Sequence, residues 1–526
     1  MVDRERRGRR DRTGGRRKGR KPDGETPRAT SSPADRGVDY RHLKNPLPLA
    51  KAFSDDQTEQ IHRTALRVIE ELGIRVLHDG ARDRFRKAGA TVDETSQMVR
   101  IDSVLVERAL ATAPSEFSLA GGNPGRTVQI GGTNLTFTPV GGPPHAIDSD
   151  RGKRPGTHED FRDFVKLAQS FDVMHMLNPS VEPQDVANHS RHLEVTRDML
   201  FLSDKPFFIY SRGEPQVRDC LELVRIARGL DETAFKAQPH CFTVINTNSP
   251  RQLDIPMCQG IMDFAAAGQP SMITPFTLAG AMAPITMVGA LTLQHAEALA
   301  GVTLSQIVDP GAPVIYGSFT SNVDMKSGAP AFGTPEFVKA AFGAGQLARH
   351  VGLPWRGSAA TASNAPDVQA CYETLNSAWA SMLGGVNVLI HAAGWLEGGL
   401  SASYEKFILD VEALQILAEA CHSLPATEAD SAFEAIAEVE PGGHFFGNTH
   451  TMERYQTAFY DPLVSDWSNF GQWTDNGSKT ATERANGIWK RVLKEYEPPK
   501  LEDDARQAID EFVERRISEG GAEPES

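Results

Sequence analysis

The chain has 526 residues, of which 40% are hydrophobic and 24% charged, and its formal net charge is −14. These proportions are normal for a globular protein. No run of about 18 apolar residues predicts a membrane span, and the acidic balance argues against a nucleic-acid or membrane surface on the folded part.

The five cysteines are an odd number, lie far apart in the chain and lack C-x-x-C spacing. This pattern argues against a disulfide framework and against a structural zinc site. A reducing cytoplasm is the simplest compartment for such a chain.

The first 45 residues form the first predicted region, a basic tail. Residues 1–36 contain 13 Arg/Lys and six Asp/Glu, a local charge of +7, which leaves −21 for the remainder. The segment has almost no large apolar residues, so it cannot bury enough surface to offset the entropy of ordering. We interpret it as a solvated, disordered tail rather than an RNA- or lipid-binding one, and no apolar segment follows its arginines as a signal peptide requires.

A small α+β lobe is predicted over residues 46–127. Apolar residues recur at helical spacing in DQTEQIHRTALRVIEELGI, which ends near Gly73. Two further helices, GARDRFRKAGA and SVLVERALATAPS, alternate with short extended pieces such as RVLH.

From residue 128 to 424, short β-rich runs alternate regularly with helical segments. The predicted strands are 135–142, 174–183, 206–212, 240–248, 271–280, 313–320, 353–360 and 387–394. A helical segment follows each one, and this alternation implies parallel pairing. Eight such units over about 300 residues fit one closed (β/α)₈ barrel, the TIM-barrel form of an α/β fold. An open doubly wound sheet is the competing fold, but the first strand ends in PVGGPPH without the expected G-x-G-x-x-G.

The last region, 425–526, is predicted as a loop and helical extension. TATERANGIWKRVLKEYEPP and EDDARQAIDEFVERRISEGG are amphipathic and charged. The segment 444–473 before them is rich in aromatic residues, and it favours a homo-oligomer in which it fills a subunit interface.

In a barrel, reactive groups gather at the carboxyl ends of the strands. His391 and Glu182 are the predicted catalytic residues, because a charged or titratable group at the end of a buried strand requires a partner. His391 has an alternative, which is a purely structural hydrogen bond to its neighbouring loop.

Several motifs are absent from the sequence. It has no H-E-x-x-H or paired Cys/His spacing, no phosphate-binding glycine loop with Lys and Ser/Thr, and no G-x-S-x-G elbow. No metal site is predicted, and nucleotide-dependent, zinc-hydrolase and serine-hydrolase functions become less favoured.

Several stretches resemble the trimethylamine:corrinoid methyltransferase superfamily. They are TEQIHRTALRVIEELGIRVLHDGARDRFRKAGATVDE, GGPPHAID, GAPAFGTPEFVKAAFGAGQLARHVGLPWRG and, most specifically, HAAGWLEGGLSASYEKFILDVEAL. The resemblance covers residues 55 to 495 and implies a (β/α)₈ barrel. It also implies transfer of a methyl group from an amine to the cobalt(I) corrinoid, a cobalamin cofactor, of a separate small protein.

Members of this family that act on trimethylamine contain pyrrolysine near the end of a late barrel strand. The equivalent slot here falls at Gly357, Ser358, Ala359 and Ala360, all ordinary residues. The chain therefore resembles the branch without pyrrolysine, whose members demethylate quaternary amines such as glycine betaine, proline betaine and carnitine.

The chemistry of a quaternary amine suits this assignment. The nucleophile attacks a methyl carbon and expels a neutral tertiary amine, so no general acid is required. Aromatic faces attract a quaternary cation by about 0.5–2 kcal/mol each, and a betaine carboxylate requires a hydrogen-bond donor. The predicted substrate-binding residues are Phe137, Asn246, Phe276, Tyr316, Phe319, Trp355, Arg356, Trp395 and Glu397.

Two alternatives remain open at this point. One is a trimethylamine methyltransferase that works without pyrrolysine, and the other is a non-catalytic protein that binds methylated amines. In the favoured interpretation, the partners are a small quaternary amine, a corrinoid protein and further copies of the chain, with neither nucleic acid nor membrane.

Overall fold

The computed structural model describes residues 33–525, so residues 1–32 of the predicted basic tail lie outside the described part of the chain. Residues 33–45 are ordered, contrary to the prediction of a disordered tail up to residue 45. They form a short 3₁₀ helix η1 (Pro33–Arg36) and strand β1 (Leu43–Lys44), and they bury Val38, Tyr40 and Leu43. Burial of these three apolar side chains stabilises the position of the segment on the body.

The N-terminal lobe contains the predicted helices and short strands. Ser54 and Gln57 form a capping box that begins the first helix. A four-stranded sheet in the order β12-β2-β4-β3 accompanies the helices. The elements are α1 (Asp55–Arg67), the π-helical turn η2 (Val68–Leu72), β2 (Ile74–Val76), α2 (Asp79–Ala88), β3 (Thr91–Asp93), β4 (Met98–Arg100), α3 (Ser103–Thr112) and β12 (Gln252–Leu253).

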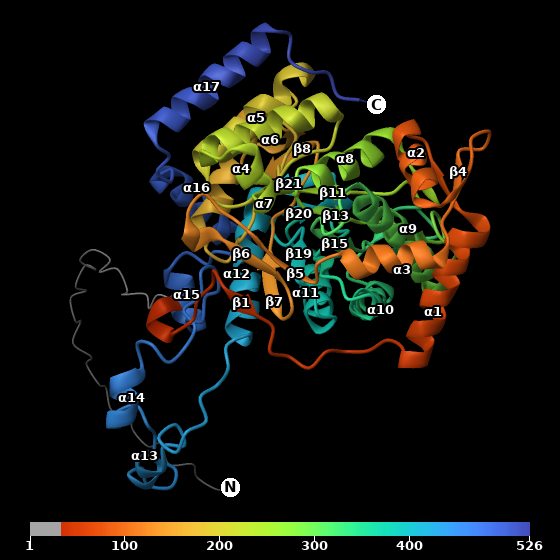
Figure 1. Ribbon diagram of the computed structural model, residues 1–526. Helices are drawn as coiled ribbons and strands as arrows, with labels where there is room; N and C mark the ends of the chain where they lie inside the picture. Colours follow the sequence, from red (N-terminus) through yellow and green to blue (C-terminus); the bar gives the residue numbers. More distant parts are fainter. Residues whose placement is uncertain (1–32, 526) are drawn as a thin grey trace, which may run out of the picture.

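A curled eight-stranded sheet forms the centre of the molecule (Figure 1), and its strand order is β1-β7-β19-β18-β15-β13-β11-β10. Strand β1 pairs antiparallel with β7, and all other neighbours in this sheet are parallel. The parallel strands are β7 (Asn134–Phe137), β10 (Phe207–Phe208), β11 (Cys241–Ile245), β13 (Ser271–Ile273), β15 (Val314–Gly317), β18 (Trp355–Ser358) and β19 (Val388–Ile390).

The predicted strand at 174–183 is a single bridge, between Leu177 and Phe207. The amide of His175 donates to the Phe137 carbonyl at 3.0 Å, and the amide of Phe208 donates to the Leu177 carbonyl at 3.0 Å. A ladder is not extended there because the Phe137 amide donates to the His175 ring nitrogen instead of a carbonyl, at 2.9 Å. Residues 175–177 nevertheless connect strand β7 to strand β10 by backbone hydrogen bonds.

Alternate strand residues face the inside of the curled sheet. The inner side chains include Met176, Phe208, Phe242, Met272, Ile315, Val388 and Ile390. The hairpin of β5 (Glu116–Leu119) and β6 (Val128–Gly131), which the sequence did not predict, packs against them through Leu119, Val128 and Ile130. Because β6 leads directly into β7, this hairpin closes the end of the sheet where the strands begin.

Helices cover the outer face of the sheet, as the alternation of strands and helices predicts (Figure 1). Helix α9 is buried on nearly its whole circumference because the lobe helices α1, α2 and α3 pack on the side that faces away from the sheet. The helices are α4 (His158–Ser170), α5 (Asn188–Leu202), α6 (Glu214–Arg228), α7 (Glu232–Ala237), α8 (Ile255–Ala266), α9 (Met287–Val308), α10 (Pro335–His350), α11 (Val368–Leu383) and α12 (Tyr404–Ala420).

Two small sheets stand where the main strands end. One has the order β20-β21-β8-β9 and the other β14-β16-β17. Strand β14 falls within the predicted strand 271–280, whereas the others were not predicted, because strands of two to four residues are too short for a periodic signal. The strands are β8 (His145–Asp148), β9 (Gly152–Pro155), β14 (Leu278–Ala279), β16 (Ser321–Val323), β17 (Pro330–Ala331), β20 (Trp395–Leu396) and β21 (Ser401–Ser403).

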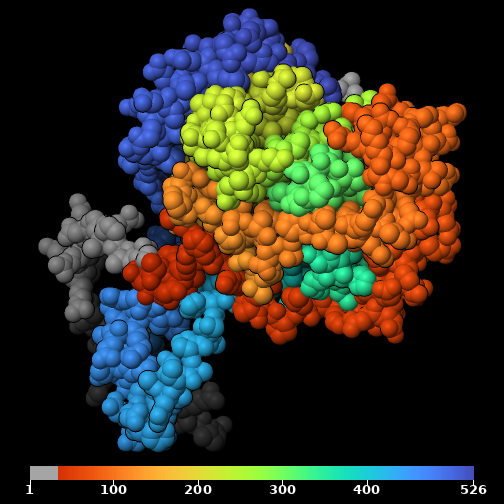
Figure 2. All heavy atoms as spheres, in the orientation of Figure 1, coloured from red at the N-terminus to blue at the C-terminus, as the bar shows by residue number. Residues whose placement is uncertain are grey.

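The C-terminal extension has two parts. Helix α16 (Ala481–Glu495) packs on α12 and α4, and α17 (Asp503–Ser518) packs on α5 and α6. The short helices α13 (Phe433–Ala437) and α14 (Thr449–Arg454) lie outside the body in Figures 1 and 2, and α15 (Phe470–Asp475) follows them. Over residues 33–525, none of the helices has the length and apolarity that a membrane crossing requires.

Candidate active site

Aromatic side chains gather where strands β13, β15 and β19 end. The Phe319 ring centroid lies 4.9 Å from Phe276, 5.2 Å from His391 and 6.0 Å from Trp395. His391 and Trp395 are closest, at 4.0 Å, and Phe332 stacks on the other side of Phe319 at 5.2 Å. We call these five residues the aromatic cluster.

His391 follows directly after β19 and has a left-handed backbone conformation, with φ of 60°. Such a conformation costs a residue other than glycine of order 1–3 kcal/mol and often marks a functional position. Ser358, at the end of the neighbouring strand β18, is hydrogen-bonded to His391 Nδ1 at 2.8 Å. Burial and the nearby charge of Arg356 hold the pKa of His391 well below its ordinary value. The imidazole is therefore neutral at physiological pH.

The loop that follows β18 holds the Trp395 side chain in place. Its indole Nε1 donates to the Thr361 carbonyl at 3.0 Å. That loop is anchored in turn on the buried carboxylate of Glu373, which accepts hydrogen bonds from the amides of Ala362 and Ser363. The indole orientation is thus fixed by the protein before any ligand arrives.

Arg356 faces the inside of the curled sheet, because its strand neighbour in register is the inner residue Val388. Its guanidinium lies 5.3 Å from the Phe319 ring centroid, and Nη1 donates to the Ser318 carbonyl at 3.0 Å. Arg356 is 2% exposed, and no described residue accepts a hydrogen bond from its Nε. Burial lowers the pKa of Arg356 to about 9. A buried cation without a carboxylate partner is costly, so this group requires an anion.

Of the other buried polar atoms that have no hydrogen-bond partner within the described chain, three lie just past the strand runs at this end of the sheet. They are Thr138 Oγ1, Asn178 Oδ1 and the Tyr210 hydroxyl. All three follow the inner strand positions of β7, residues 174–178 and β10 by one or two residues. Buried polar atoms are nearly always paired in folded proteins, so unpaired ones at the strand ends indicate a ligand or ordered water.

Glu182, the second predicted catalytic residue, lies in a separate ionic cluster. Its carboxylate accepts from Arg191 Nη1 at 2.7 Å and from Arg212 Nη1 at 2.8 Å. Burial raises the pKa of Glu182, but Arg212 and Arg191 outweigh burial and hold the pKa below its ordinary value. The Arg212 guanidinium also lies 4.2 Å from the Tyr210 ring centroid. Glu182 is thus an ionised carboxylate committed to two arginines and not a proton donor.

Three of the predicted substrate-binding residues lie between the sheet and its helices. Phe137, Tyr316 and Trp355 pack with helix residues in the outer core. The Tyr316 hydroxyl is hydrogen-bonded to His295 on α9 at 2.8 Å, and the Trp355 indole donates to Ser318 Oγ at 2.9 Å. The sequence did not separate them from inner residues because strands buried on both faces show no alternation of polar and apolar side chains.

The remaining predicted positions are Asn246, Glu397 and the slot equivalent to pyrrolysine. Asn246 is exposed just after β11. Glu397 pairs with Lys153 Nζ at 2.6 Å and accepts from Ser401 Oγ at 2.7 Å, so it fastens the loop between β20 and β21. In the slot equivalent to pyrrolysine, Gly357 faces α11, Ser358 contacts His391, and Ala359 and Ala360 are fully buried.

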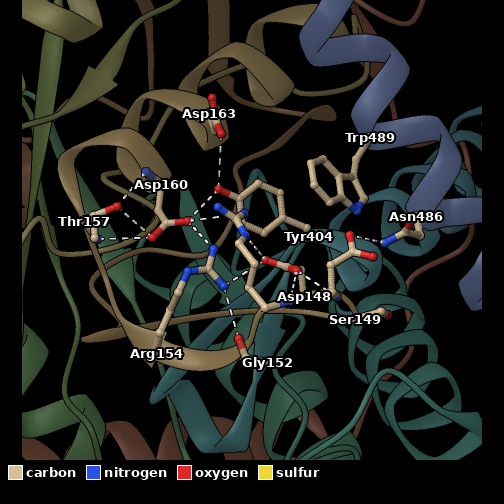
Figure 3. Close-up of polar contacts among 12 residues, drawn as sticks. Asp148, Ser149, Gly152, Arg154, Thr157, Asp160, Asp163, Tyr404, Asn486 and Trp489 are labelled. Atoms are coloured by element: carbon tan, nitrogen blue, oxygen red, sulfur yellow. Dashed lines mark hydrogen bonds and ion pairs between the residues drawn. The ribbon is translucent and has the colours of Figure 1, made fainter.

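A buried ionic network fixes the β8–β9 hairpin beside these loops (Figure 3). Asp148 accepts from Arg154 Nη1 at 2.8 Å, and Arg154 also pairs with Asp160 on α4. The Tyr404 hydroxyl, at the start of α12, donates to Asp160 at 2.8 Å. Because β8 pairs with β21, this network also holds the loop after Trp395 in place.

Thr138, Asn178 and Phe332 were not predicted from the sequence as site residues. The first two were detectable in principle, because each is a polar residue within or just after an apolar strand run. Phe332 comes from the β17 region, where the sequence offers no strand signal. Among the described residues, no group of His, Cys, Asp and Glu side chains has the arrangement of a metal site.

Comparison with known proteins gives a consistent result. A family model described as trimethylamine methyltransferase (MTTB) matches residues 12–521. The glycine betaine methyltransferase of Desulfitobacterium hafniense strain Y51 is 35% identical over 91% of this chain and 99% of that protein. The trimethylamine methyltransferase MttB of D. hafniense strain DCB-2 is 30% identical over 89% of this chain and 94% of that protein. The solved monomethylamine methyltransferase of Methanosarcina barkeri covers 91% of this chain and 96% of its own, at 10% identity and a TM-score of 0.46.

Proposed function

The chain belongs to the trimethylamine methyltransferase (MTTB) family, and we propose that it transfers a methyl group from a quaternary amine that bears a carboxylate, of the glycine betaine type. The methyl acceptor in this proposal is the cobalt(I) corrinoid of a separate protein. Family membership confirms the resemblance predicted from the sequence and the assignment as a methyltransferase.

Arg356 is the observation that carries the choice of substrate. It is a buried guanidinium, without a carboxylate partner among residues 33–525, at the carboxyl end of the sheet. A betaine supplies the missing anion through its carboxylate, whereas trimethylamine has none. The hydroxyls of Thr138 and Tyr210, which have no partner in the described chain, offer further hydrogen-bond donors at the carboxyl ends of the strands.

The aromatic cluster suits the other end of such a substrate. Quaternary ammonium groups bind on aromatic faces, at about 0.5–2 kcal/mol per face. Phe276, Phe319 and Trp395 present their rings within one group, and the neutral His391 ring adds no opposing charge. The ammonium and the carboxylate would thus occupy adjacent parts of one site.

The reaction makes few demands on proton transfer. The C–N bond breaks, its electron pair stays on nitrogen, and the neutral tertiary amine leaves without a proton. The residues of this chain bind the cation, aim one methyl group outward and exclude water. This division of work agrees with the neutral state of His391 within the aromatic cluster.

For the fold, we infer a (β/α)₈ barrel. The alternation of parallel strands and helices supports it, as do the backbone hydrogen bonds through residues 175–177 that connect β7 to β10, the two outermost parallel strands of the curled sheet. A barrel places the candidate site at its catalytic end.

The rim of that end also suits a protein partner. Exposed apolar side chains follow the strand ends there, and these include Met282, Ile285, Val288, Met325, Val368 and Leu400. An exposed apolar rim is typical of a surface that binds another protein. A corrinoid protein must dock at this end to bring its acceptor to the substrate.

The test is methylation of free cob(I)alamin by the purified protein with glycine betaine, proline betaine, carnitine and trimethylamine as separate donors. Transfer from a carboxylate-bearing donor but not from trimethylamine is expected. Transfer from trimethylamine alone would contradict the proposal, and binding of betaine without any transfer would indicate a non-catalytic binding protein.

The Arg356→Met variant isolates the role of the carboxylate. The dissociation constant for glycine betaine should rise about 10- to 100-fold, because a charge-assisted hydrogen bond is lost. Arg212→Met is the matched control, since Arg212 already has Glu182 as its partner. If both variants bind glycine betaine like the unmodified protein, Arg356 does not recognise the carboxylate.

A further inference from the structure

Residues 424–459 form a segment that leaves the body and returns to it, and we call it the arm. It contains α13 and α14 and connects the end of α12 to Tyr460. Figures 1 and 2 show these helices beside the body rather than on its surface.

The arm has no core of its own. Of its 36 residues, only Ala435 is buried. Large apolar side chains are nevertheless frequent in it, and the most exposed are Leu424 at 92%, Phe446 at 83%, Phe459 at 78% and Phe433 at 72%. Ile436, Phe445, Met452 and Tyr455 are exposed as well. A solvated linker would have few aromatic residues, so this surface indicates a contact that another molecule completes.

The base of the arm is fixed to the body. Glu419, just before the arm, accepts from Arg36 at 2.6 Å and from the Tyr40 hydroxyl at 2.7 Å. Just after it, the Arg36 guanidinium lies 5.8 Å from the Tyr460 ring centroid. The two ends of the arm therefore lie close together and project the segment from a rigid point.

This base lies at the end of the molecule opposite the candidate active site. Helix α12 begins after β21, near the strand carboxyl ends, and runs back to the level of β1, which pairs with the first residues of β7. A protein that delivers a methyl acceptor must reach the strand carboxyl ends. The arm is therefore poorly placed to receive that partner.

We propose that the arm docks on a second copy of this chain and joins the copies of a homo-oligomer. Its apolar surface is permanent, so it requires a partner that is always present, and another copy of the chain meets that condition. An aromatic side chain buries about 150–250 Å², so the exposed parts of five aromatic residues supply roughly 600–800 Å². Two arms exchanged across a twofold axis then reach the area of a standard stable interface, about 1,600 Å².

The first test measures the solution mass of the full chain by light scattering and by sedimentation. The unmodified protein should have a multiple of 57.3 kDa at micromolar concentration. The triple variant Phe433→Ser/Phe446→Ser/Phe459→Ser should shift the dissociation constant of the oligomer by about 100-fold or more, because central aromatic residues dominate interface energies. Val104→Ser, on α3, is the matched control that removes an exposed apolar side chain elsewhere.

Two results would overturn the proposal. One is a single-copy mass for the unmodified protein, and the other is an unchanged oligomer in the triple variant. A second variant replaces residues 424–459 with a short Gly/Ser linker, which the closeness of Glu419 and Tyr460 to Arg36 permits. It should keep the far-UV circular dichroism and methyl-transfer activity of the body and have the single-copy mass.

A photo-crosslinking amino acid at position 446 identifies the occupant directly. A crosslinked product of two chains is expected. A product within one chain only would show that the arm folds on its own body, and a product that appears only when a corrinoid protein is added would assign the arm to that partner. Neither result depends on which amine is the methyl donor, so failure of this proposal is distinguishable from failure of the proposed function.

Discussion

At the strand ends, polar atoms are buried without partners, whereas on the arm large apolar side chains stand in solvent. The first region contains Arg356 Nε, Thr138 Oγ1 and the Tyr210 hydroxyl, and the second contains Phe433, Phe446 and others. Both arrangements are unfavourable for an isolated folded chain. The difference between them indicates what each region lacks: a small polar ligand in one case and an apolar protein surface in the other.

The two regions also differ in how firmly they are held. Around the candidate site, Trp395 is fixed through Thr361, and His391 through Ser358. The arm is held to the described part of the body at its base, at Glu419 and Tyr460. A small ligand needs a site that is already formed, whereas the arm can become ordered when a partner subunit binds to it.

Replacing His391 with alanine should have the largest effect on the site. The turnover number should fall by about 100-fold or more, because the aromatic cluster loses the ring that contacts both Phe319 and Trp395 and the methyl group is no longer aimed. Initial rates of cob(I)alamin methylation measure this effect. His240→Ala is the control, since His240 is a buried histidine that stacks on Phe235 near the start of β11. A large loss of melting temperature with unchanged turnover would instead assign His391 a purely structural role.

The neutral state of His391 gives a second, smaller effect, on stability. Its folded pKa is lowered, so below pH of about 6.5 the unfolded chain binds a proton that the folded chain does not. The free energy of unfolding should therefore fall as pH decreases, by about 1.4 kcal/mol per pH unit from this residue, and the dependence should vanish above about pH 7. Urea unfolding from pH 5 to 8 measures the free energy of unfolding of the protein and of His391→Asn. The pH dependence of this free energy should differ between the two by the equivalent of one proton below pH of about 6.5, and it should be the same above about pH 7. Equal slopes would mean that His391 keeps its ordinary pKa.

Much of the fold was predictable from the sequence, but the inner lining of the site was not. Helix α4, for example, begins at Thr157 with Asp160 three residues later, a capping pattern that is visible in the letters. The strand sequences carry no comparable signal of which side chains face the inside of the sheet. Ile315 faces inward and Tyr316 outward, and Arg356 faces inward while Trp355 faces outward, although all four lie in runs buried on both faces. A charged residue in such a run was the best available signal, and Arg356 is the predicted residue that now carries the substrate assignment.

Two tyrosine variants test whether an unpaired buried hydroxyl at the strand ends serves the substrate rather than the stability of the fold. Tyr404→Phe should lower the free energy of unfolding by about 1–2 kcal/mol, because its hydroxyl is hydrogen-bonded to the buried Asp160. Tyr210→Phe should leave stability unchanged, since its hydroxyl has no partner in the described chain, but it should raise the Michaelis constant for glycine betaine about 5- to 10-fold. Chemical denaturation and initial rates measure the two effects. A loss of stability in Tyr210→Phe would show that the hydroxyl is already satisfied without substrate.

The smallest expected effect concerns the base of the arm. Deletion of residues 1–32 should change neither methyl transfer nor melting temperature, whereas Arg36→Ala should lower the free energy of unfolding by about 1 kcal/mol. The reason is that the Arg36 side chain is largely buried and bonded to Glu419. Arg67→Ala is the matched control, because its exposed pair with Glu71 should contribute less than half as much. Since Arg36 contacts residues on both sides of the arm, its loss should also weaken the oligomer. An unchanged oligomer with a lowered melting temperature would mean that the contacts at the tip of the arm hold the copies together without help from its base.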